Sequence, residues 1–192
     1  MSEQGKASIE IQVEKVSQLF DSLDPSPFSR RDLAARAEDY IVGSARELPT
    51  RQPVEIVVHL PTTEVNGLAG GQLGTAFHNY FLDRAEHAGL ELKNLLRTGR
   101  LSLLIGMVVL AVSFGVGAAL QRLFEGVFGE YWIEGLIILG WVALWRPMEI
   151  FLYEWWPLLG ERNLYRRLAT AEVVVRPIDP HAVGAGAAGP QG

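Results

Sequence analysis

The feature that most constrains this chain is an uncharged run of 21 residues between Arg100 and Arg122, LSLLIGMVVLAVSFGVGAALQ. As an α-helix, a run of this length covers about 31 Å, which matches the hydrocarbon core of a bilayer. A buried helix of a soluble protein rarely stays uncharged for so long. We therefore predict a transmembrane helix over residues 99–124.

A second apolar segment follows, but it is less regular. Only 11 uncharged residues separate Glu134 from Arg146, and as a helix they cover about 17 Å, too little to cross a bilayer unaided. We therefore extend the second transmembrane helix into the aromatic segment beyond it, over residues 131–156, after a short turn at 125–130. Pro147 should bend or end the straight helix near Trp145, because it lacks a backbone N–H.

The ends of both helices carry aromatic and charged side chains that suit the membrane interface. Aromatic rings that are partly polar gather at headgroup depth, and long charged side chains reach from there into water. The predicted interfacial residues are Arg100, Trp132, Glu134, Trp145, Arg146, Glu149, Tyr153, Trp155 and Trp156. Arg146 can pair with Glu149, three residues further along. Anchoring is favoured over an ion path, which two helices could form only with several copies of the chain.

Basic residues near the helix ends predict the orientation in the membrane. The connector between the helices carries one arginine and three glutamates, whereas the outer flanks are basic. The flanking basic residues are Lys93, Arg97 and Arg100 before the first helix and Arg162, Arg166 and Arg167 after the second. The positive-inside rule then predicts that both termini are cytoplasmic.

The remaining segments predict a small α/β domain built from both chain ends. Residues 8–16 alternate between apolar and polar side chains, and Pro53 to Leu60 is rich in branched residues, so both are expected strands. Ser29 with Asp32 resembles an N-cap box for a helix that lies between them and stops at Pro49. Such a crossover normally makes the two strands parallel.

A third strand is expected at Ala171 to Arg176, returning to the same sheet. The predicted domain therefore takes a strand-helix-strand-helix region from 1–98 and a helix end with a strand from 157–178, and residues 179–192 form a disordered tail. The second helix of this region begins near Thr75, and it can run on without a break into the first transmembrane helix. The predicted fold class is thus a membrane α-helical hairpin with a small cytoplasmic α/β domain.

Small residues in the first transmembrane helix predict close helix packing. Ala111 with Gly115, and Ser113 with Gly117, are each four residues apart, a spacing that lets two helix backbones approach closely. The predicted packing residues are Gly106, Ala111, Ser113, Gly115 and Gly117. The partner is either the second helix of the same chain or another membrane protein, including a second copy.

Composition excludes several function classes. The net charge of -5 argues against a general nucleic-acid binder. The absence of cysteine removes thiolate catalysis and cysteine-held metals. The glycine-rich segment 66–74 follows a strand but lacks the lysine of a phosphate-binding loop, so a connector is the simpler interpretation. The four histidines show no metal-ligand spacing. No catalytic residue, metal or cofactor is predicted.

Four stretches carry a resemblance to a known family: LFDSLDPSPF from Leu19, AEDYIV with ARELP from Ala37, VHLP from Val58, and GWVALWRPMEIFLY from Gly140. With these, the chain resembles a family of uncharacterised bacterial inner-membrane proteins with two transmembrane helices. The resemblance covers most of the chain outside the glycine-rich segment and the tail. It implies a bacterial inner membrane and the two-helix topology, and it carries over no site residues.

These patterns predict a non-catalytic membrane subunit or scaffold. It would self-associate or dock onto a larger membrane complex through its helices and present the cytoplasmic domain, with the lipid bilayer as its other partner. The alternative is a component of an oligomeric channel or transporter that uses Glu134 and Arg146.

Overall fold

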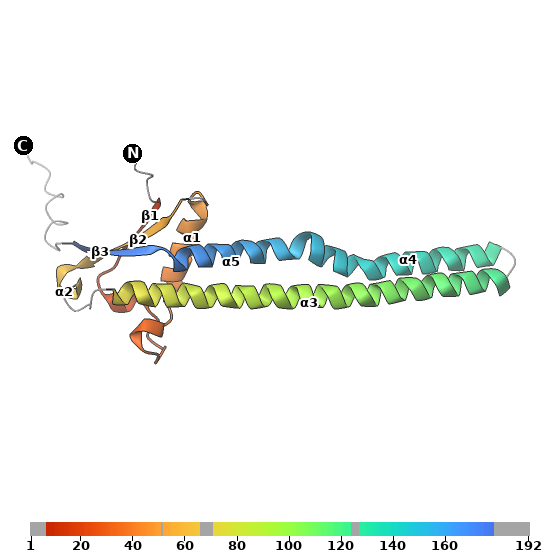
Figure 1. The fold of residues 1–192 in the computed structure, drawn as a ribbon, viewed down its shortest axis with the longest axis horizontal. Helices are drawn as coiled ribbons and strands as arrows, with labels where there is room; N and C mark the ends of the chain where they lie inside the picture. The colour runs from red at the N-terminus through yellow and green to blue at the C-terminus, as the bar shows by residue number, and fades with distance from the viewer. Residues whose placement is uncertain (1–6, 51, 66–70, 124–126, 179–192) are drawn as a thin grey trace, which may run out of the picture. The chain divides into compact units, whose positions relative to one another are not determined.

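The computed structural model describes residues 7–50, 52–65, 71–123 and 127–178. The chain divides into two compact units, one formed by residues up to Glu86 together with those from Arg162 onward, and the other by His87–Glu161. We call them the α/β unit and the helical unit. Within the described residues, the fold is mostly helical, with one small sheet (Figure 1).

The α/β unit contains a parallel three-stranded sheet in the order β1-β2-β3, from β1 (Ala7–Gln12), β2 (Val54–Pro61) and β3 (Glu172–Ile178). In the register, Ile9 pairs with Ile56, which in turn pairs with Val173. The prediction that the C-terminal strand joins the sheet of the two N-terminal strands is therefore confirmed.

One face of this sheet forms the core. On that face Ile9, Ile56, Val58 and Leu60 are nearly inaccessible to solvent, whereas the alternate residues of β1 are exposed. Apolar side chains of α1 (Ala35–Glu47), of the first turns of α3 (Gln72–Leu123) and of the end of α5 (Trp155–Ala169) complete the cluster. The alternation seen in the sequence thus marks the buried side of β1 correctly.

Helix α1 begins later than the Ser29 and Asp32 pattern predicts. Its N-cap is Ala34, which makes no side-chain hydrogen bond. The predicted N-cap box is wrong because Asp32 is held elsewhere: its backbone N–H donates to Oδ2 of Asp24 at 2.8 Å. Leu33 then forms an isolated bridge with Phe20. Short helical turns, η1 (Val16–Leu19) and η2 (Phe28–Arg30), lie in this connection.

Asp24 organises this connection through its carboxylate. Its Oδ1 accepts a hydrogen bond from the backbone N–H of Ser26 at 2.9 Å. The Ser26 hydroxyl, followed by the N–H groups of Asp32 and Ser26, holds the pKa of Asp24 below its ordinary value, because each donor favours the ionised carboxylate.

After β2, the short α2 (Thr62–Val65) leads toward α3, which is one continuous helix of 52 residues. It begins at Gln72, slightly before the predicted Thr75, and Gly71 before it takes a φ of 88°, which glycine adopts without strain. The prediction of an unbroken helix through the first apolar run is confirmed. Residues 66–70 of the glycine-rich segment and the tail lie outside the described residues.

We call α3 the first arm and residues 127–169 the second arm. The second arm consists of three consecutive helical pieces. Helix α4 (Val127–Glu149) is followed by a π-helical turn, η3 (Ile150–Glu154), and then by α5. Helix α4 starts before the predicted residue 131, so residues 127–130 are helical rather than part of a turn. Pro147 does not end the helix near Trp145, because α4 continues through it for two more residues and a π turn follows. The other part of the expectation, that Pro147 bends the helix, stays a prediction.

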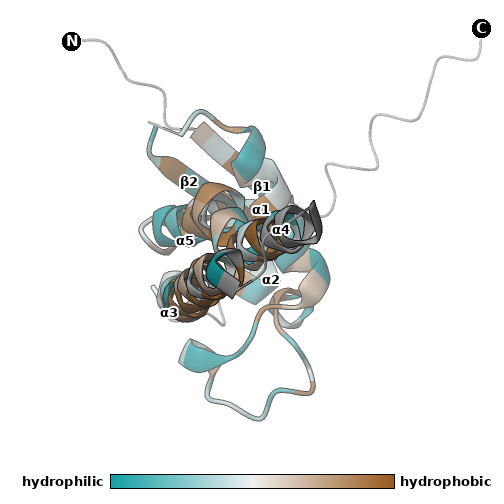
Figure 2. Cartoon of the chain, turned by 90° about the vertical axis from the view of Figure 1, so that its right-hand side faces the viewer, coloured by the Kyte–Doolittle hydropathy of each residue, from teal (hydrophilic) through white to brown (hydrophobic). Residues whose placement is uncertain are grey.

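Two helical stretches, Gln72–Leu120 and Glu134–Ala169, are long and apolar enough to cross a membrane, judged by length and composition. In the most apolar 18-residue segment of each stretch, only 17% of the segment is buried within the chain. A core helix of a soluble protein is mostly buried instead. Figure 2 shows that α3 is rich in hydrophobic residues.

Candidate functional site

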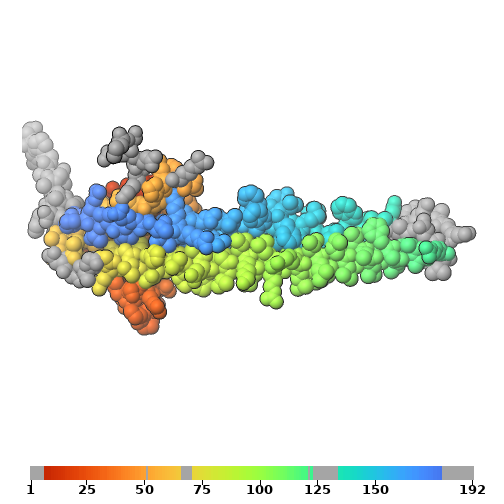
Figure 3. Space-filling model, viewed as in Figure 1, coloured from red at the N-terminus to blue at the C-terminus, as the bar shows by residue number. Residues whose placement is uncertain are grey.

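The candidate site is the contact between α3 and α4 in the helical unit, together with the charged cluster around Pro147. Figure 3 shows α3 and α4 packed side by side. At three of the described glycines, Gly99, Gly106 and Gly140, an added Cβ would meet the opposite arm at less than 3.0 Å. In a helix hairpin, small residues let the backbones come together where a larger side chain would hold them apart.

Gly106 lies against the backbone of α4. A Cβ added to Gly106 would meet the carbonyl oxygen of Ala143 at 2.8 Å and Cδ2 of Leu144 at 2.9 Å. The glycine hydrogen that takes this direction therefore faces the Ala143 carbonyl, a geometry typical of weak Cα–H···O contacts between helices. The predicted packing role of Gly106 thus has a specific partner within the chain.

The same carbonyl is the one that Pro147 leaves without its usual partner. In an α-helix, the C=O of residue 143 accepts the N–H of residue 147, which proline lacks. Neighbouring helices commonly compensate for such freed groups in membrane helices. The contact from Gly106 places a weak donor at this position, which links the glycine of one arm to the proline of the other.

Gly99 and Gly140 were not among the predicted packing residues. A Cβ at Gly99 would lie 2.7 Å from Cγ2 of Ile150, the first residue of the π turn, and a Cβ at Gly140 would lie 2.5 Å from Cδ1 of Leu110. Ile150 is fully buried. The sequence does contain a signal for Gly99, because helices that pack along one seam repeat every seven residues. Residues at this spacing on α3, all of them buried in the structure, are Leu92, Gly99, Gly106 and Ser113.

The five predicted packing residues divide between two sides of α3. Gly106, Ser113 and Gly117 are buried, whereas Ala111 and Gly115 are exposed. A Cβ added at Gly115 meets nothing within 4 Å. The Ser113 and Gly117 pair therefore lies on the buried side, and the Ala111 and Gly115 pair lies on an outer side that no described residue covers. We call this second pair the outer small-residue face.

A charged cluster spans the π turn. The Arg146 guanidinium donates to Oε2 of Glu149 at 3.3 Å, and it also binds both carboxylate oxygens of Glu154. Trp145 donates from Nε1 to Oε1 of Glu149 at 2.9 Å. The predicted pair of Arg146 and Glu149 is confirmed, but Glu154 was missed.

The π turn explains why Glu154 is within reach of Arg146. Residues eight apart in an α-helix are separated by about 2.2 turns and face different directions. A π turn takes up one additional residue, so Arg146 and Glu154 are arranged like residues seven apart, which share a face. Nothing in the local sequence around Pro147 signals this shift of the helical face.

The other predicted interfacial residues are placed as follows. Arg100, Glu134, Tyr153 and Trp156 are exposed. Trp155 is partly buried, donates from Nε1 to the carbonyl of Phe151 at 2.8 Å, and has its ring 4.6 Å from that of Trp156. Trp132 belongs to α4, but its side chain lies outside the described part of the chain. Glu134 and Arg146 are 12 residues apart on the second arm, which separates them by about 18 Å along the helix.

Two of the histidines, His59 and His78, each lie near an oxygen atom of the α/β unit. Nδ1 of His78 lies 2.7 Å from the carbonyl oxygen of Ala169, and Nε2 of His59 lies 3.6 Å from Oε2 of Glu10. Among the described residues, no group of three or more histidine and carboxylate side chains is arranged to hold a metal ion.

Comparison of this chain with models of protein families, with curated proteins and with solved structures gives no match. The family resemblance drawn from the sequence motifs therefore stays a prediction.

Proposed function

We propose that this chain is a two-span protein of a bacterial inner membrane with both termini in the cytoplasm. The support is the apolar surface that the helical unit leaves uncovered: Leu104, Val108 and Phe114 on α3, and Ile138 and Val142 on α4, are each more than half exposed. Contiguous apolar surface of this kind requires lipid or a partner to cover it. The basic flanks described above support the orientation.

Within that membrane, we infer a non-catalytic subunit or scaffold that self-associates or docks onto a larger membrane complex. The observation that carries the inference is the outer small-residue face. Ala111 and Gly115 are spaced for close helix contact but are exposed, while the equivalent inward pair, Ser113 and Gly117, is already buried. A second α3 or a foreign membrane helix can approach this face, and the α/β unit would then be presented to the cytoplasm.

Three matched glycine substitutions test this proposal. Gly115→Leu fills the outer small-residue face, whereas Gly135→Leu adds the same side chain to another exposed glycine that has open space around it. Gly106→Leu instead collides with the backbone of α4. The measurement is the native mass of the purified protein in lipid nanodiscs, with chemical crosslinking in the native membrane to capture other subunits.

We expect the wild type and Gly135→Leu to form the same assembly, and Gly115→Leu to release a folded, lone chain. Gly106→Leu should lose thermal stability of the chain itself, because its effect is on the hairpin. A wild-type chain that is monomeric and crosslinks to nothing, or a Gly115→Leu variant that assembles like the wild type, would refute the scaffold proposal.

The topology can be tested separately because the chain has no cysteine. Single cysteines at Ser8 and Thr170 should react with an impermeant maleimide only after the cytoplasmic side is opened, and one at Arg122 should react from outside. Labelling of Ser8→Cys in intact cells would contradict the proposed orientation.

The alternative, an oligomeric channel or transporter component that uses Glu134 and Arg146, draws less support from the geometry. Arg146 is engaged by Glu149 and Glu154 of its own arm, and Glu134 lies far from it along the helix. Ion flux in liposomes that falls in Glu134→Gln and Arg146→Gln variants would favour this alternative over the scaffold.

A further inference from the structure

Strand β1 is one edge of the sheet, and its outer side has unused backbone groups. The N–H groups of Ala7 and Val13 donate to the carbonyls of Pro53 and His59, which establishes that the odd-numbered residues face β2. The even-numbered residues Ser8, Glu10 and Gln12 therefore direct their N–H and C=O groups outward. Among all of these outward groups, only the Glu10 carbonyl has a partner in the described chain.

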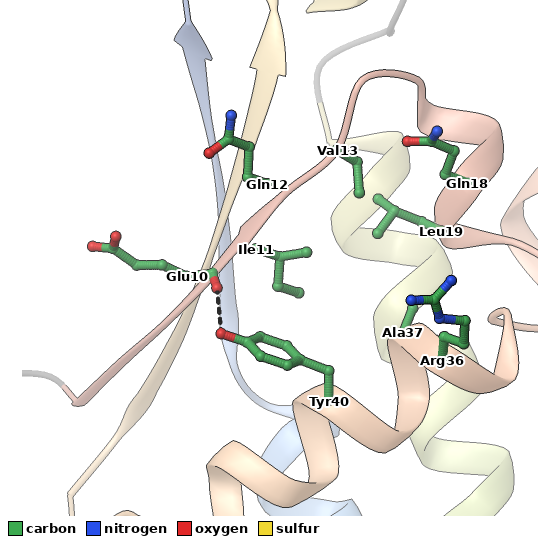
Figure 4. Close-up of a pocket in the computed structure, with 9 residues that line it drawn as sticks. All are labelled: Glu10, Ile11, Gln12, Val13, Gln18, Leu19, Arg36, Ala37 and Tyr40. Atoms are coloured by element: carbon green, nitrogen blue, oxygen red, sulfur yellow. Dashed lines mark hydrogen bonds between the residues drawn. The ribbon is translucent and has the colours of Figure 1, made fainter. Parts of the chain in front are cut away.

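That partner is Tyr40 of α1. Its hydroxyl donates to the Glu10 carbonyl oxygen at 3.2 Å, as the dashed line in Figure 4 shows. A free sheet edge normally attracts another strand, and proteins either cover such edges or use them for binding. Tyr40 covers one acceptor only, so the outward amides of Glu10 and Gln12 and the carbonyl of Gln12 stay accessible.

A groove of about 610 Å³ runs beside this part of β1. Its walls come from β1, from η1 and from the first turns of α1. Figure 4 shows Ile11 of β1, and Val13 just after the strand, facing Leu19 and Ala37 across this space, with the side chain of Glu10 directed away from it. The groove thus combines apolar side chains with the open backbone of an edge strand.

The groove also carries an uncompensated positive charge. Arg36 lines it, and within the described part of the chain its side chain makes neither an ion pair nor a hydrogen bond. The other charged lining residue, Glu10, points to the opposite face of the sheet, where its carboxylate lies 3.6 Å from His59. The groove is therefore complementary to a ligand with a negative charge.

We propose that the β1 edge binds an extended peptide segment of another protein, and that this segment carries an acidic side chain. The peptide adds a fourth strand to the sheet through the outward amides of Glu10 and Gln12 and the carbonyl of Gln12. One of its apolar side chains enters the groove beside Val13 and Ala37, which are partly exposed there, and its carboxylate binds Arg36. This mode obtains affinity from backbone hydrogen bonds and specificity from alternate side chains. The inference depends on the α/β unit alone and not on self-association of the helices.

The test uses the full-length chain in lipid nanodiscs and a phage library of random twelve-residue peptides, with empty nanodiscs for counter-selection. We expect enriched peptides to be β-prone and to contain aspartate or glutamate. If nothing is enriched over empty nanodiscs, or if the enriched peptides are predominantly basic, the proposal is overturned.

Matched variants then locate the binding site. Gln12→Pro removes an outward N–H at an edge position where proline is tolerated, whereas Gln12→Ala keeps this N–H. Arg36→Glu reverses the groove charge, and Arg166→Glu makes the same change on an exposed residue of α5. Loss of a hydrogen bond to a charged or backbone group corresponds to roughly tenfold in affinity. We expect about tenfold weaker binding for Gln12→Pro and Arg36→Glu, and less than about twofold change for the two controls.

Backbone amide exchange provides a check that does not depend on the choice of peptide. In the peptide-free chain, the amides of Glu10 and Gln12 should exchange quickly, because they have no acceptor, whereas those of Ile9 and Ile11 should be protected by β2. A bound peptide should slow the first pair. Slow Ile9 and Ile11 exchange in Gln12→Pro shows that the sheet is intact.

Three results of these measurements would overturn the proposal. One is protection of Glu10 and Gln12 in the peptide-free chain, which means that the edge is already covered. Another is protection that rises with protein concentration, which indicates that a second copy occupies the edge. The third is an enriched peptide that binds Gln12→Pro and Arg36→Glu as tightly as the wild type. None of the three bears on whether Gly115→Leu releases a lone chain, so failure here and failure of the scaffold proposal are distinguishable.

Discussion

Replacing Gly106 with alanine tests the close contact between the two arms more sharply than any other single change. The added Cβ would lie 2.8 Å from the carbonyl oxygen of Ala143 and 3.3 Å from its carbonyl carbon. An ordinary contact begins near 3.4 Å, so the arms must separate locally by about 0.6 Å, the difference between 3.4 and 2.8 Å. The Leu144 methyl can rotate away, but the backbone of Ala143 cannot.

Two opposing effects determine the size of the change. Glycine to alanine in a helix interior favours the helix by about 0.5 to 1 kcal/mol. Overpacking of a tight contact costs about 1 to 3 kcal/mol, and the weak contact to the Ala143 carbonyl is lost as well. We therefore expect Gly106→Ala to lower the free energy of unfolding by about 1 to 2 kcal/mol. The matched control is Gly115→Ala, where a Cβ meets nothing within 4 Å and only the favourable helix effect remains.

The assay is equilibrium unfolding by SDS in mild detergent micelles, followed by tryptophan fluorescence. It reports on the helical unit because all five tryptophans lie between residues 132 and 156. The diagnostic result is that Gly106→Ala lowers the free energy of unfolding whereas Gly115→Ala raises it. If Gly106→Ala is as stable as the wild type, or if Gly115→Ala loses as much stability as Gly106→Ala, α3 does not pack tightly on the Ala143 carbonyl.

Three further changes probe the α/β unit. Phe81→Ala should destabilise it by about 3 to 5 kcal/mol, measured by thermal unfolding, because the ring is fully buried among other aromatic rings; a loss below about 1 kcal/mol would contradict this packing. Arg84→Ala should cost no more than about 1 kcal/mol, since its 2.6 Å ion pair with Glu38 is half exposed on the arginine side, and a double-mutant cycle with Glu38→Ala measures the pair. The lowered pKa of Asp24 means that its contribution to stability is present above the unfolded pKa of about 3.9 and is lost as the pH falls through the folded value. Asp24→Asn should therefore flatten the acid limb of the stability curve, and an unchanged acid limb would refute the role of this carboxylate.

Several elements of the fold could be predicted from local sequence because their causes are local. The alternation from Ser8 onward identifies the buried side of β1, and Pro49 stops α1 after Glu47. The strand-helix-strand order predicted a parallel pair, since a crossover connection of this length leaves few other arrangements. The start of α1 was predicted wrongly. The N-cap box would have Ser29 accept the Asp32 N–H, but Asp24, eight residues before Asp32, accepts it instead.

The candidate site was predictable in its residue types but not in its geometry. Small residues every three or four positions indicate that α3 packs closely against something, but they do not reveal which side faces α4. That assignment depends on the rotation of α3 about its axis, and the structure shows it by contacts such as that of Leu110 with Gly140 of the second arm. The reach of Arg146 to Glu154 likewise depends on a π turn that shifts the helical face, for which the local sequence offers no pattern.

Sequence and tertiary structure determine different properties of the two apolar arms. Sequence alone indicated both arms: the first through 21 consecutive uncharged residues, and the second through a shorter apolar run extended by aromatic residues. Tertiary structure alone decided that Gly106, Ser113 and Gly117 are used within the chain while Ala111 and Gly115 stay open on α3. The physical reason is that hydrophobicity is a property of each residue and can be summed along the chain, whereas a contact depends on which two surfaces meet.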